Sequence, residues 1–281
     1  MALWLIGGTQ ESRCCVEEWV AQWPAPALDG PPRLIITVTT PSARALYADH
    51  PGVRVWVGQI APDQAHAFLT QHSITAILDV SHPFATAVSA LAIALAQQYH
   101  LPYLRYERSL APLPPQPWQD HAHRPGLVRL PDIQQALDKT YLAPQERTLL
   151  TLGRQWLPLF EPWQQHTQLF ARILPMAEAV TAAIAAGFTR QRLIALHPPV
   201  TPALEKALWQ QWEISQVITK ASGAPGGEAT KYEIAAQLGV RLLVIDRPPI
   251  AYPRQTHCLT TAIAFAWDPV ATTNRLATSG N

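Results

Sequence analysis

The first candidate for chemistry in the chain is Gly7-Gly8-Thr9, which directly follows the apolar run 2–6. Glycine lets the backbone approach a ligand closely, and free N–H groups at the start of a helix attract anions. A strand, a glycine turn and a helix in this order therefore predict a phosphate or pyrophosphate site. A complete G-x-G-x-x-G is absent, so a tight strand-to-helix turn without a ligand is an equally good interpretation.

The strongest local feature is the segment 219–231, TKASGAPGGEATK, which follows a predicted strand and opens a predicted helix. Exposed amides and ammonium groups in such a loop form a cradle for anions. No Gly-Lys-Ser/Thr closes the loop, so it is not a Walker A motif and ATP hydrolysis is not expected. Arg154 lies just after another predicted strand and is expected to add a further anion contact. The residues expected to bind anions in the loop are Lys220, Ser222, Gly223, Gly226, Gly227 and Lys231.

The end of the second predicted strand favours NADPH over NADH. A dinucleotide fold that prefers NAD commonly has an acidic residue there, for the ribose hydroxyls. This chain instead has Thr39, Thr40, Ser42 and Arg44, which suit a 2′-phosphate. The alternative is that Ser42 caps a helix and Arg44 is a solvated surface residue.

A histidine segment, Asp79-Val80-Ser81-His82-Pro83, lies where the fourth predicted strand meets its helix. Pro83 suits the first helical turn, which places Ser81 and His82 at the same sheet edge as the glycine turn. His82 is a candidate for acid–base or positioning work. A hydrogen-bonded structural histidine is the more common case at a strand end.

Charge and aromatic groups also follow the fifth predicted strand, at Arg105, Tyr106 and Arg108. Two arginines beside a tyrosine suit a ligand that carries carboxylates on a planar ring system. A surface network of arginine and glutamate is an equally good interpretation.

Composition narrows the class of protein. The 281 residues are 48% hydrophobic and 15% charged, which indicates a folded globular chain. A formal net charge of +1 excludes the basic field that sequence-independent nucleic-acid binding needs. Apolar runs are too short for a membrane span, and the N-terminus has no signal-peptide pattern, so a cytoplasmic location is expected. The three cysteines lack metal-ligand spacing, and no metal site is predicted.

Short apolar runs alternate with Ala-rich helical segments, which is typical of α/β proteins with parallel sheets. We predict two doubly wound Rossmann-like domains of about five strands each, with the active site in the interdomain cleft. The domains are residues 1–108 and 147–250, joined by a Pro-rich linker at 109–146 and followed by a tail at 251–281. Strands are expected at 2–6, 33–39, 53–57, 76–80, 103–105, 148–152, 168–173, 193–196, 215–219 and 242–245. Helices are expected at 9–23, 42–49, 62–72, 83–99, 132–139, 176–186, 202–212, 228–238 and 256–267.

Taken together, six motifs in this order and spacing resemble the precorrin-6A reductase family. They are GGTQES, DVSHPFA, YLRYER, LTLGRQWLPLF, FARILP and TKASGAPGGEATKYEIAAQLGVRLLVIDRP, and the likeness runs from about Leu3 to Pro248. The resemblance implies an enzyme of cobalamin biosynthesis that uses NADPH or NADH to reduce one C=C bond of precorrin-6A or its cobalt form. Val80 and Ser81 depart mildly from the small residues that the family commonly shows.

The resemblance and the residues together predict which residues bind the cofactor and which bind the substrate. The first domain binds the nicotinamide cofactor through Gly7, Gly8, Thr9 and residues 39–44, and His82 has a positioning role. The macrocycle, as substrate, is held by residues of both domains, in a monomer or weak homo-oligomer. Two other functions use the same loops: a nucleotide-sugar transferase, and a non-catalytic two-lobed anion-binding protein. The substrate contacts are expected to be Ser81, Arg105, Tyr106, Arg108, Arg154 and the loop residues from Lys220 to Lys231.

Overall fold

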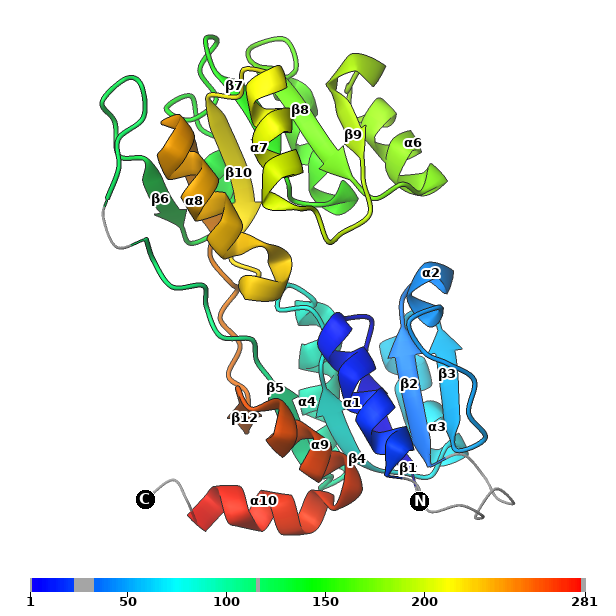
Figure 1. Cartoon of the computed structure of the whole chain (residues 1–281). Helices are drawn as coiled ribbons and strands as arrows, with labels where there is room; N and C mark the ends of the chain where they lie inside the picture. The colour runs from blue at the N-terminus through cyan, green and yellow to red at the C-terminus, as the bar shows by residue number, and fades with distance from the viewer. Residues whose placement is uncertain (1, 23–32, 115–116, 279–281) are drawn as a thin grey trace. The chain divides into compact units, whose positions relative to one another are not determined.

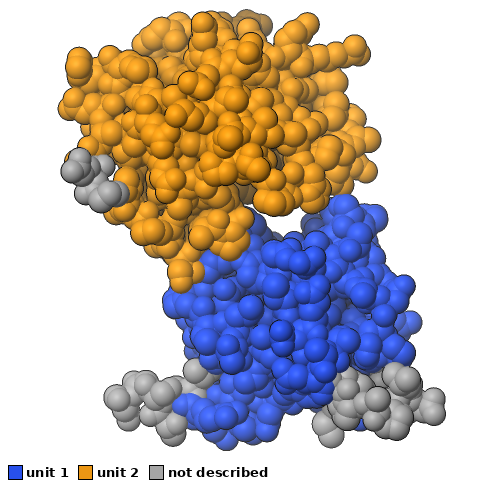
Figure 2. All heavy atoms as spheres, in the orientation of Figure 1, with its two compact units in different colours: residues 1–108, 249–281 blue, residues 109–248 orange. Residues whose placement is uncertain are grey.

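The computed structural model describes residues 2–22, 33–114 and 117–278, which fold into two compact units (Figure 1). The first unit takes residues 1–108 and 249–281, and the second takes residues 109–248 (Figure 2). The second unit is therefore inserted between two segments of the chain that together form the first unit.

The first unit is built on a six-stranded sheet in the order β12-β5-β4-β1-β2-β3, with every neighbouring pair parallel. Read from β3 to β12, this is the strand order 3-2-1-4-5-6 of dinucleotide-binding folds. The strands are β1 (Ala2–Ile6), β2 (Leu34–Val38), β3 (Val53–Val57), β4 (Ile74–Asp79), β5 (Tyr103–Tyr106) and β12 (Gln255–Thr256).

Helices cover both faces of this sheet, because successive side chains of a strand point to opposite sides. In β1, Leu3 and Leu5 pack into one core with α1 and α9, while Trp4 and Ile6 pack into another with α3 and α4. The helices of this unit are α1 (Gln10–Ala21), α2 (Pro41–Arg44), α3 (Pro62–Gln71), α4 (Thr86–Gln98), α9 (Leu259–Trp267) and α10 (Pro269–Thr278).

The second unit repeats the design with a parallel sheet in the order β6-β11-β10-β7-β8-β9. One face is covered by α7 and α8, which place Trp209 and Tyr232 against the sheet residues Val217 and Leu242. Its strands are β6 (Leu127–Leu130), β7 (Arg147–Leu150), β8 (Gln168–Ile173), β9 (Leu193–Ala195), β10 (Gln216–Lys220) and β11 (Arg241–Ile245). Its helices are α5 (Ile133–Ala136), α6 (Ala177–Ala185), α7 (Pro202–Gln211) and α8 (Glu228–Leu238), with the 3-10 turns η1 (Arg154–Trp163), η2 (Arg190–Arg192) and η3 (Ala224–Gly226).

The predicted α/β class and all ten predicted strands are confirmed, with strand ends within two residues of the expected positions. Two helices differ. The helix expected at 42–49 is only Pro41–Arg44, because the next residues close tighter i→i+3 turns, including Tyr47 N to Arg44 O at 3.2 Å. The helix expected from Pro83 begins at Thr86, so Pro83 lies in the preceding turn. Residue 23, the expected end of the first helix, lies outside the described residues.

The unit boundaries also differ from those expected. The segment 109–146 is part of the second unit, because β6 pairs with β11 and the buried Ile133 and Ala136 of α5 join its core. The segment 251–281 belongs to the first unit, because β12 pairs with β5 and Phe265 of α9 is buried. Each sheet thus has six strands, one more than expected.

Within residues 2–22, 33–114 and 117–278, none of the helices has the length and apolar character that a bilayer-spanning segment needs.

Candidate functional site

The glycine turn of the first unit joins β1 to α1. Gly8 has φ +92°, a conformation that favours glycine, and a Cβ there would meet only Ala43 Cβ at 4.0 Å. Space above the turn is therefore open. Thr9 caps α1: its Oγ1 accepts from Ser12 N at 3.1 Å and donates to Val80 O at 2.8 Å. The Thr9 hydroxyl thus works within the turn, although the sequence suggested it as a ligand contact.

A tyrosine that the sequence did not single out supports this turn. The Tyr47 hydroxyl accepts from Gly8 N at 2.8 Å and lies 2.7 Å from Ser12 Oγ. Burial raises the pKa of this hydroxyl above its ordinary value, against the hydrogen bonds from Gly8 and Ser12, which lower it. The hydroxyl therefore stays neutral across the physiological range. Its 39-residue separation from Gly8 left no signal in the sequence.

The residues expected to bind a 2′-phosphate follow β2. Thr39 and Ser42 are exposed, while the Thr40 hydroxyl caps α2 by accepting from Ala43 N at 3.2 Å. Arg44 is partly exposed, forms an ion pair with Asp49 and donates from Nη1 to Tyr47 O at 2.8 Å. These exposed groups remain candidates for cofactor contact, and Arg44 also orders the segment that carries Tyr47.

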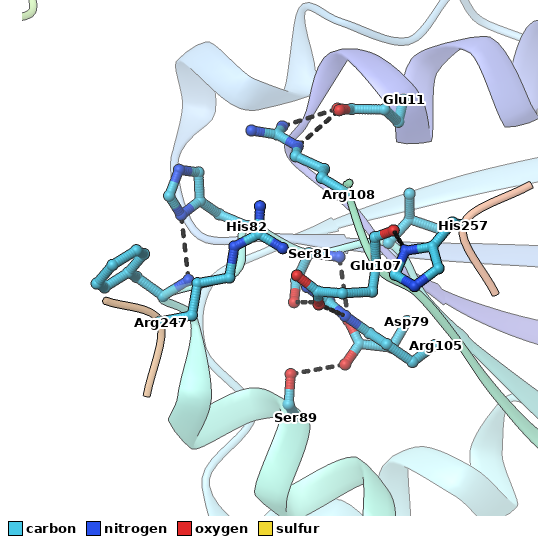
Figure 3. Close-up of polar contacts among 12 residues, drawn as sticks. Glu11, Asp79, Ser81, His82, Ser89, Arg105, Glu107, Arg108, Arg247 and His257 are labelled. Carbon is cyan, nitrogen blue, oxygen red and sulfur yellow. Dashed lines mark hydrogen bonds and ion pairs between the residues drawn. The ribbon is translucent and has the colours of Figure 1, made fainter. Parts of the chain in front are cut away.

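A buried polar network occupies the ends of β4 and β5 (Figure 3). The Arg105 guanidinium forms ion pairs with Asp79, at 2.8 Å, and with Glu107, at 2.9 Å, and it donates to Ser81 Oγ at 3.0 Å. Asp79 also accepts from Ser89 Oγ at 2.6 Å and from Tyr103 Oη at 3.0 Å. Burial alone would lower the pKa of Arg105, but the negative charge of Asp79, with Tyr252 and Glu107, raises it.

Arg105 is therefore corrected from a substrate contact to an internal support. Its side chain and that of Asp79 are 0% exposed. The cause is β12, which pairs with β5 on its outer side, together with Tyr252, whose ring lies 5.2 Å from the guanidinium carbon. Ser81 is buried as well, with its hydroxyl accepting from Arg105.

His82 follows this network and is partly buried. Its Nδ1 accepts from Phe84 N at 3.2 Å, which fixes the ring over the turn before α4. The assignment of His82 as a positioning residue remains a prediction.

Arg108 is engaged by Glu11 in the first turn of α1. The guanidinium contacts both carboxylate oxygens, with Nε to Oε1 at 2.6 Å and Nη2 to Oε2 at 2.7 Å. Both side chains are about 10% exposed, so Arg108 fastens the end of the first segment to α1 instead of presenting a free charge. Tyr106 is partly buried, and burial, followed by the nearby Glu11 charge, raises its pKa.

The glycine-rich loop of the second unit is held by ionisable groups. Glu228, fully buried, accepts from Gly223 N at 2.8 Å and from Tyr232 Oη at 2.5 Å. The Lys231 ammonium donates to the carbonyls of Gly226 and Gly227, at 3.0 and 3.3 Å. These support roles left no signal in the sequence, because the contacts depend on the turn η3.

Close packing explains the glycines and the buried serine of this loop. A Cβ on Gly226 would lie 1.8 Å from Ser222 Oγ, and Gly227 has φ +69°. Ser222 is buried, while Gly223 has φ +76°. These residues shape the loop around its own backbone.

Two lysines of the loop have lowered pKa values. Burial lowers the pKa of Lys220 to about 8, and burial together with the Arg172 charge lowers that of Lys231 to about 8. Lys220 is partly buried and Lys231 buried, whereas Arg154 after β7 is exposed. Arg154 and Lys220 are thus the predicted anion contacts best placed for a ligand. Among the described residues, no cluster of His, Cys, Asp and Glu forms a metal site.

Comparison with known proteins decides the family. The model of the precorrin-6x reductase family CbiJ/CobK matches residues 2–267. A cobalt-precorrin-6A reductase from Synechocystis sp. is 45% identical over 249 residues, covering 88% of this chain and 88% of the relative. The chain belongs to the precorrin-6x reductase family. This membership confirms the predicted resemblance and leaves the transferase and anion-binding alternatives without support.

Other members of the family give the same result. A precorrin-6A reductase from Rhodobacter capsulatus is 30% identical over 206 residues, covering 71% of this chain and 72% of the relative. The solved structure of a CobK precorrin-6A reductase superposes with a TM-score of 0.72 at 21% identity, covering 96% and 97% of the two chains. That structure establishes that the precorrin-6x reductase fold extends over both units.

The first unit fits a nicotinamide dinucleotide, the cofactor expected of a precorrin-6x reductase. Its strand order is that of dinucleotide-binding sheets, and β1 runs through an open glycine turn into the N-terminus of an α-helix. The exposed Thr39, Ser42 and Arg44 follow the adjacent strand, where the ribose end of a dinucleotide binds in such folds.

Proposed function

We propose that the chain reduces one C=C bond of cobalt-precorrin-6A, with NADPH as the reductant. The observation that carries the proposal is the 45% identity to a cobalt-precorrin-6A reductase over 88% of the chain, within a family model that spans both units. The bound dinucleotide supplies a hydride, and one proton completes the saturated carbon pair.

In this proposal the first unit binds the cofactor. The amides at the start of α1 receive the pyrophosphate, and the open surface at Gly8 admits it without a side chain in the way. Thr39, Ser42 and Arg44 bind the 2′-phosphate, which is the basis for NADPH as the preferred cofactor. Asp79 and Arg105 hold the Ser81–His82 turn in place, and His82 orients the reacting groups.

The second unit supplies cations for the carboxylates of the macrocycle. Arg154 is exposed and Lys220 is partly buried at the end of β10, and we assign both to the acetate and propionate groups. Lys231, Ser222 and the glycines keep the loop in shape from inside. For the whole protein, a cytoplasmic location and a monomer or weak homo-oligomer remain predictions.

The proposal is tested by four anaerobic reactions, in which cobalt-precorrin-6A or metal-free precorrin-6A is mixed with NADPH or NADH. Nicotinamide absorbance and the mass of the tetrapyrrole are followed together. We expect the cobalt form with NADPH to react fastest, with one cofactor oxidised for each two hydrogens gained. Cofactor oxidation without a change in tetrapyrrole mass, or no reaction in any mixture, would refute it. Faster reaction of the metal-free form would reassign the substrate only.

A further inference from the structure

The Tyr47 hydroxyl is the acceptor that fixes the backbone of the first glycine turn. It accepts from Gly8 N at 2.8 Å and meets Ser12 Oγ at 2.7 Å, and the tyrosine is 4% exposed. Ser12 Oγ in turn donates to Thr9 O at 2.7 Å and accepts from Thr9 N at 3.0 Å. The Tyr47 hydroxyl therefore contacts both the Gly7–Gly8 turn and the first helical turn of α1.

Gly7 leaves room for this hydroxyl. A Cβ on Gly7 would lie 2.3 Å from Tyr47 Oη, with Tyr47 Cζ at 3.2 Å and Ile36 Cγ2 at 3.1 Å. Real Cβ atoms do not approach an oxygen so closely, so a side chain on Gly7 would displace the tyrosine. The absence of a side chain at Gly7 makes room for the Tyr47 hydroxyl, whereas the absence of one at Gly8 leaves the surface of the turn open.

From this geometry we propose that Tyr47 is a positioning residue for the dinucleotide, holding the Gly7–Gly8 turn in its binding shape before the cofactor arrives. The inference rests on the proposed function and adds to it a residue that contacts the turn from inside. Two successive glycines are conformationally permissive, so a turn without this acceptor samples other shapes. The cofactor then loses affinity, because binding must also order the turn.

The same tyrosine connects the turn to the proposed 2′-phosphate contact. Arg44 donates to the Tyr47 carbonyl at 2.8 Å, and the i→i+3 bond from Tyr47 N to Arg44 O closes the segment. A phosphate on Arg44 and a pyrophosphate beside Gly8 would therefore be bound by one ordered unit of structure.

The first test is Tyr47→Phe, which keeps the buried ring and removes the hydroxyl. The dissociation constant for NADPH is measured by nicotinamide fluorescence without tetrapyrrole, and KM for the tetrapyrrole is measured separately. We expect the NADPH constant to rise about three- to tenfold, as the loss of one hydrogen bond predicts, with the tetrapyrrole KM unchanged. Tyr99→Phe is the matched control, because its hydroxyl bonds His66 Nδ1 at 2.7 Å, away from the glycine turn.

An unchanged NADPH dissociation constant in Tyr47→Phe, with or without a lower Tm, would overturn the inference, since the hydroxyl would then serve stability alone. Equal increases in the NADPH dissociation constant and in the tetrapyrrole KM would also overturn it. If the wild-type chain binds no dinucleotide, the proposed function and this inference fail together. Normal wild-type binding and turnover with an unaffected variant reject only the role of Tyr47.

A second test uses the contact between Gly7 and Tyr47. We expect Gly7→Ala to weaken NADPH binding strongly in the wild-type chain and less in the Tyr47→Phe background, where the 2.3 Å contact is gone. Equal losses in both backgrounds would show that the added methyl group acts independently of the Tyr47 hydroxyl and would overturn the inference.

Discussion

Five strands follow the same order in the two sheets, β3-β2-β1-β4-β5 and β9-β8-β7-β10-β11, but the segments that follow β1 and β7 differ. In the first unit, β1 leads through Gly7 and Gly8 into the α-helix α1. In the second, β7 leads through Gly153 into the 3-10 segment η1, which contains Pro158 and Pro162. Anions bind at the N-terminus of an α-helix, where aligned amides are free. The first unit therefore suits a dinucleotide, because its glycine turn leads into an α-helix.

A second difference lies at the ends of β4 and β10, which are corresponding strands in the two sheets. A buried cation from a neighbouring element contacts the residues at or after each end. The guanidinium of Arg105, in β5, has carboxylate partners, whereas the ammonium of Lys231, in α8, donates to backbone carbonyls. Their pKa values accordingly shift in opposite directions, upward for Arg105 and downward for Lys231. The first end is a paired structural network, and the second is a loop whose charge depends on pH.

The largest expected effect breaks the paired network. Asp79→Asn leaves the buried Arg105 charge without one of its two carboxylates, which should lower the free energy of unfolding by about 3 kcal/mol. Urea unfolding measures the loss. Asp49→Asn removes the partner of Arg44 at a position that is 92% exposed, and should cost less than about 0.5 kcal/mol. Similar losses in the two variants would contradict the distinction between buried and exposed pairs.

The pH dependence of stability above neutrality tests the lowered pKa of Lys231 in the second unit. The pKa of Lys231 is about 8 in the folded chain, against an ordinary value of 10.5. Between these two pH values the lysine is mostly protonated in the unfolded chain and mostly neutral in the folded chain. Stability should therefore rise with pH through that window, by about 2 kcal/mol from pH 7 to 9.5.

The measurement is the difference in unfolding free energy between wild type and Lys231→Met across this range, since other groups titrate equally in both. Lys139→Met, at an exposed lysine, is the control. A pH-independent difference, or a wild type that loses stability relative to Lys231→Met as pH rises, would contradict the assigned shift.

The smallest expected effect concerns the choice of cofactor in the first unit. Arg44→Ala should raise KM for NADPH about tenfold more than KM for NADH, because only NADPH carries the 2′-phosphate. Steady-state kinetics with both cofactors gives the ratio, which cancels any effect through the Tyr47 carbonyl. Arg13→Ala, on the exposed side of α1, is the control. Equal changes for both cofactors would remove Arg44 from the 2′-phosphate site.

The sequence predicted those parts of the molecule that depend on local pattern. Apolar runs located the long strands, and the order of strand, glycine turn and helix located the turn at Gly7. The sequence failed where a contact spans a long separation. Arg105 lies in β5, which the sequence indicated as the last strand of its sheet, yet β12 pairs with β5 from 150 residues later and helps to bury Arg105. The two-residue strand β12 is too short for a recognisable alternation, whereas β6 was missed because it lies in the Pro-rich segment that was predicted to be a linker.

The same reason explains the errors within the candidate site. Arg108 looked free because Glu11 lies 97 residues away in the chain, and Tyr47 gave no signal because its ring reaches Gly8 from another loop. Motifs thus indicated which loops matter, whereas the division between supporting and available side chains required three-dimensional contacts.

The proposed function rests on hydride transfer from a nicotinamide dinucleotide to cobalt-precorrin-6A. The most direct test uses NADPH labelled with deuterium at C4, supplied as each of the two epimers, and mass spectrometry of the tetrapyrrole product. We predict that one epimer transfers its deuterium to a ring carbon of the product and that the other leaves it on the oxidised cofactor. A reduced product without deuterium from either epimer would show that the dinucleotide is not the hydride donor.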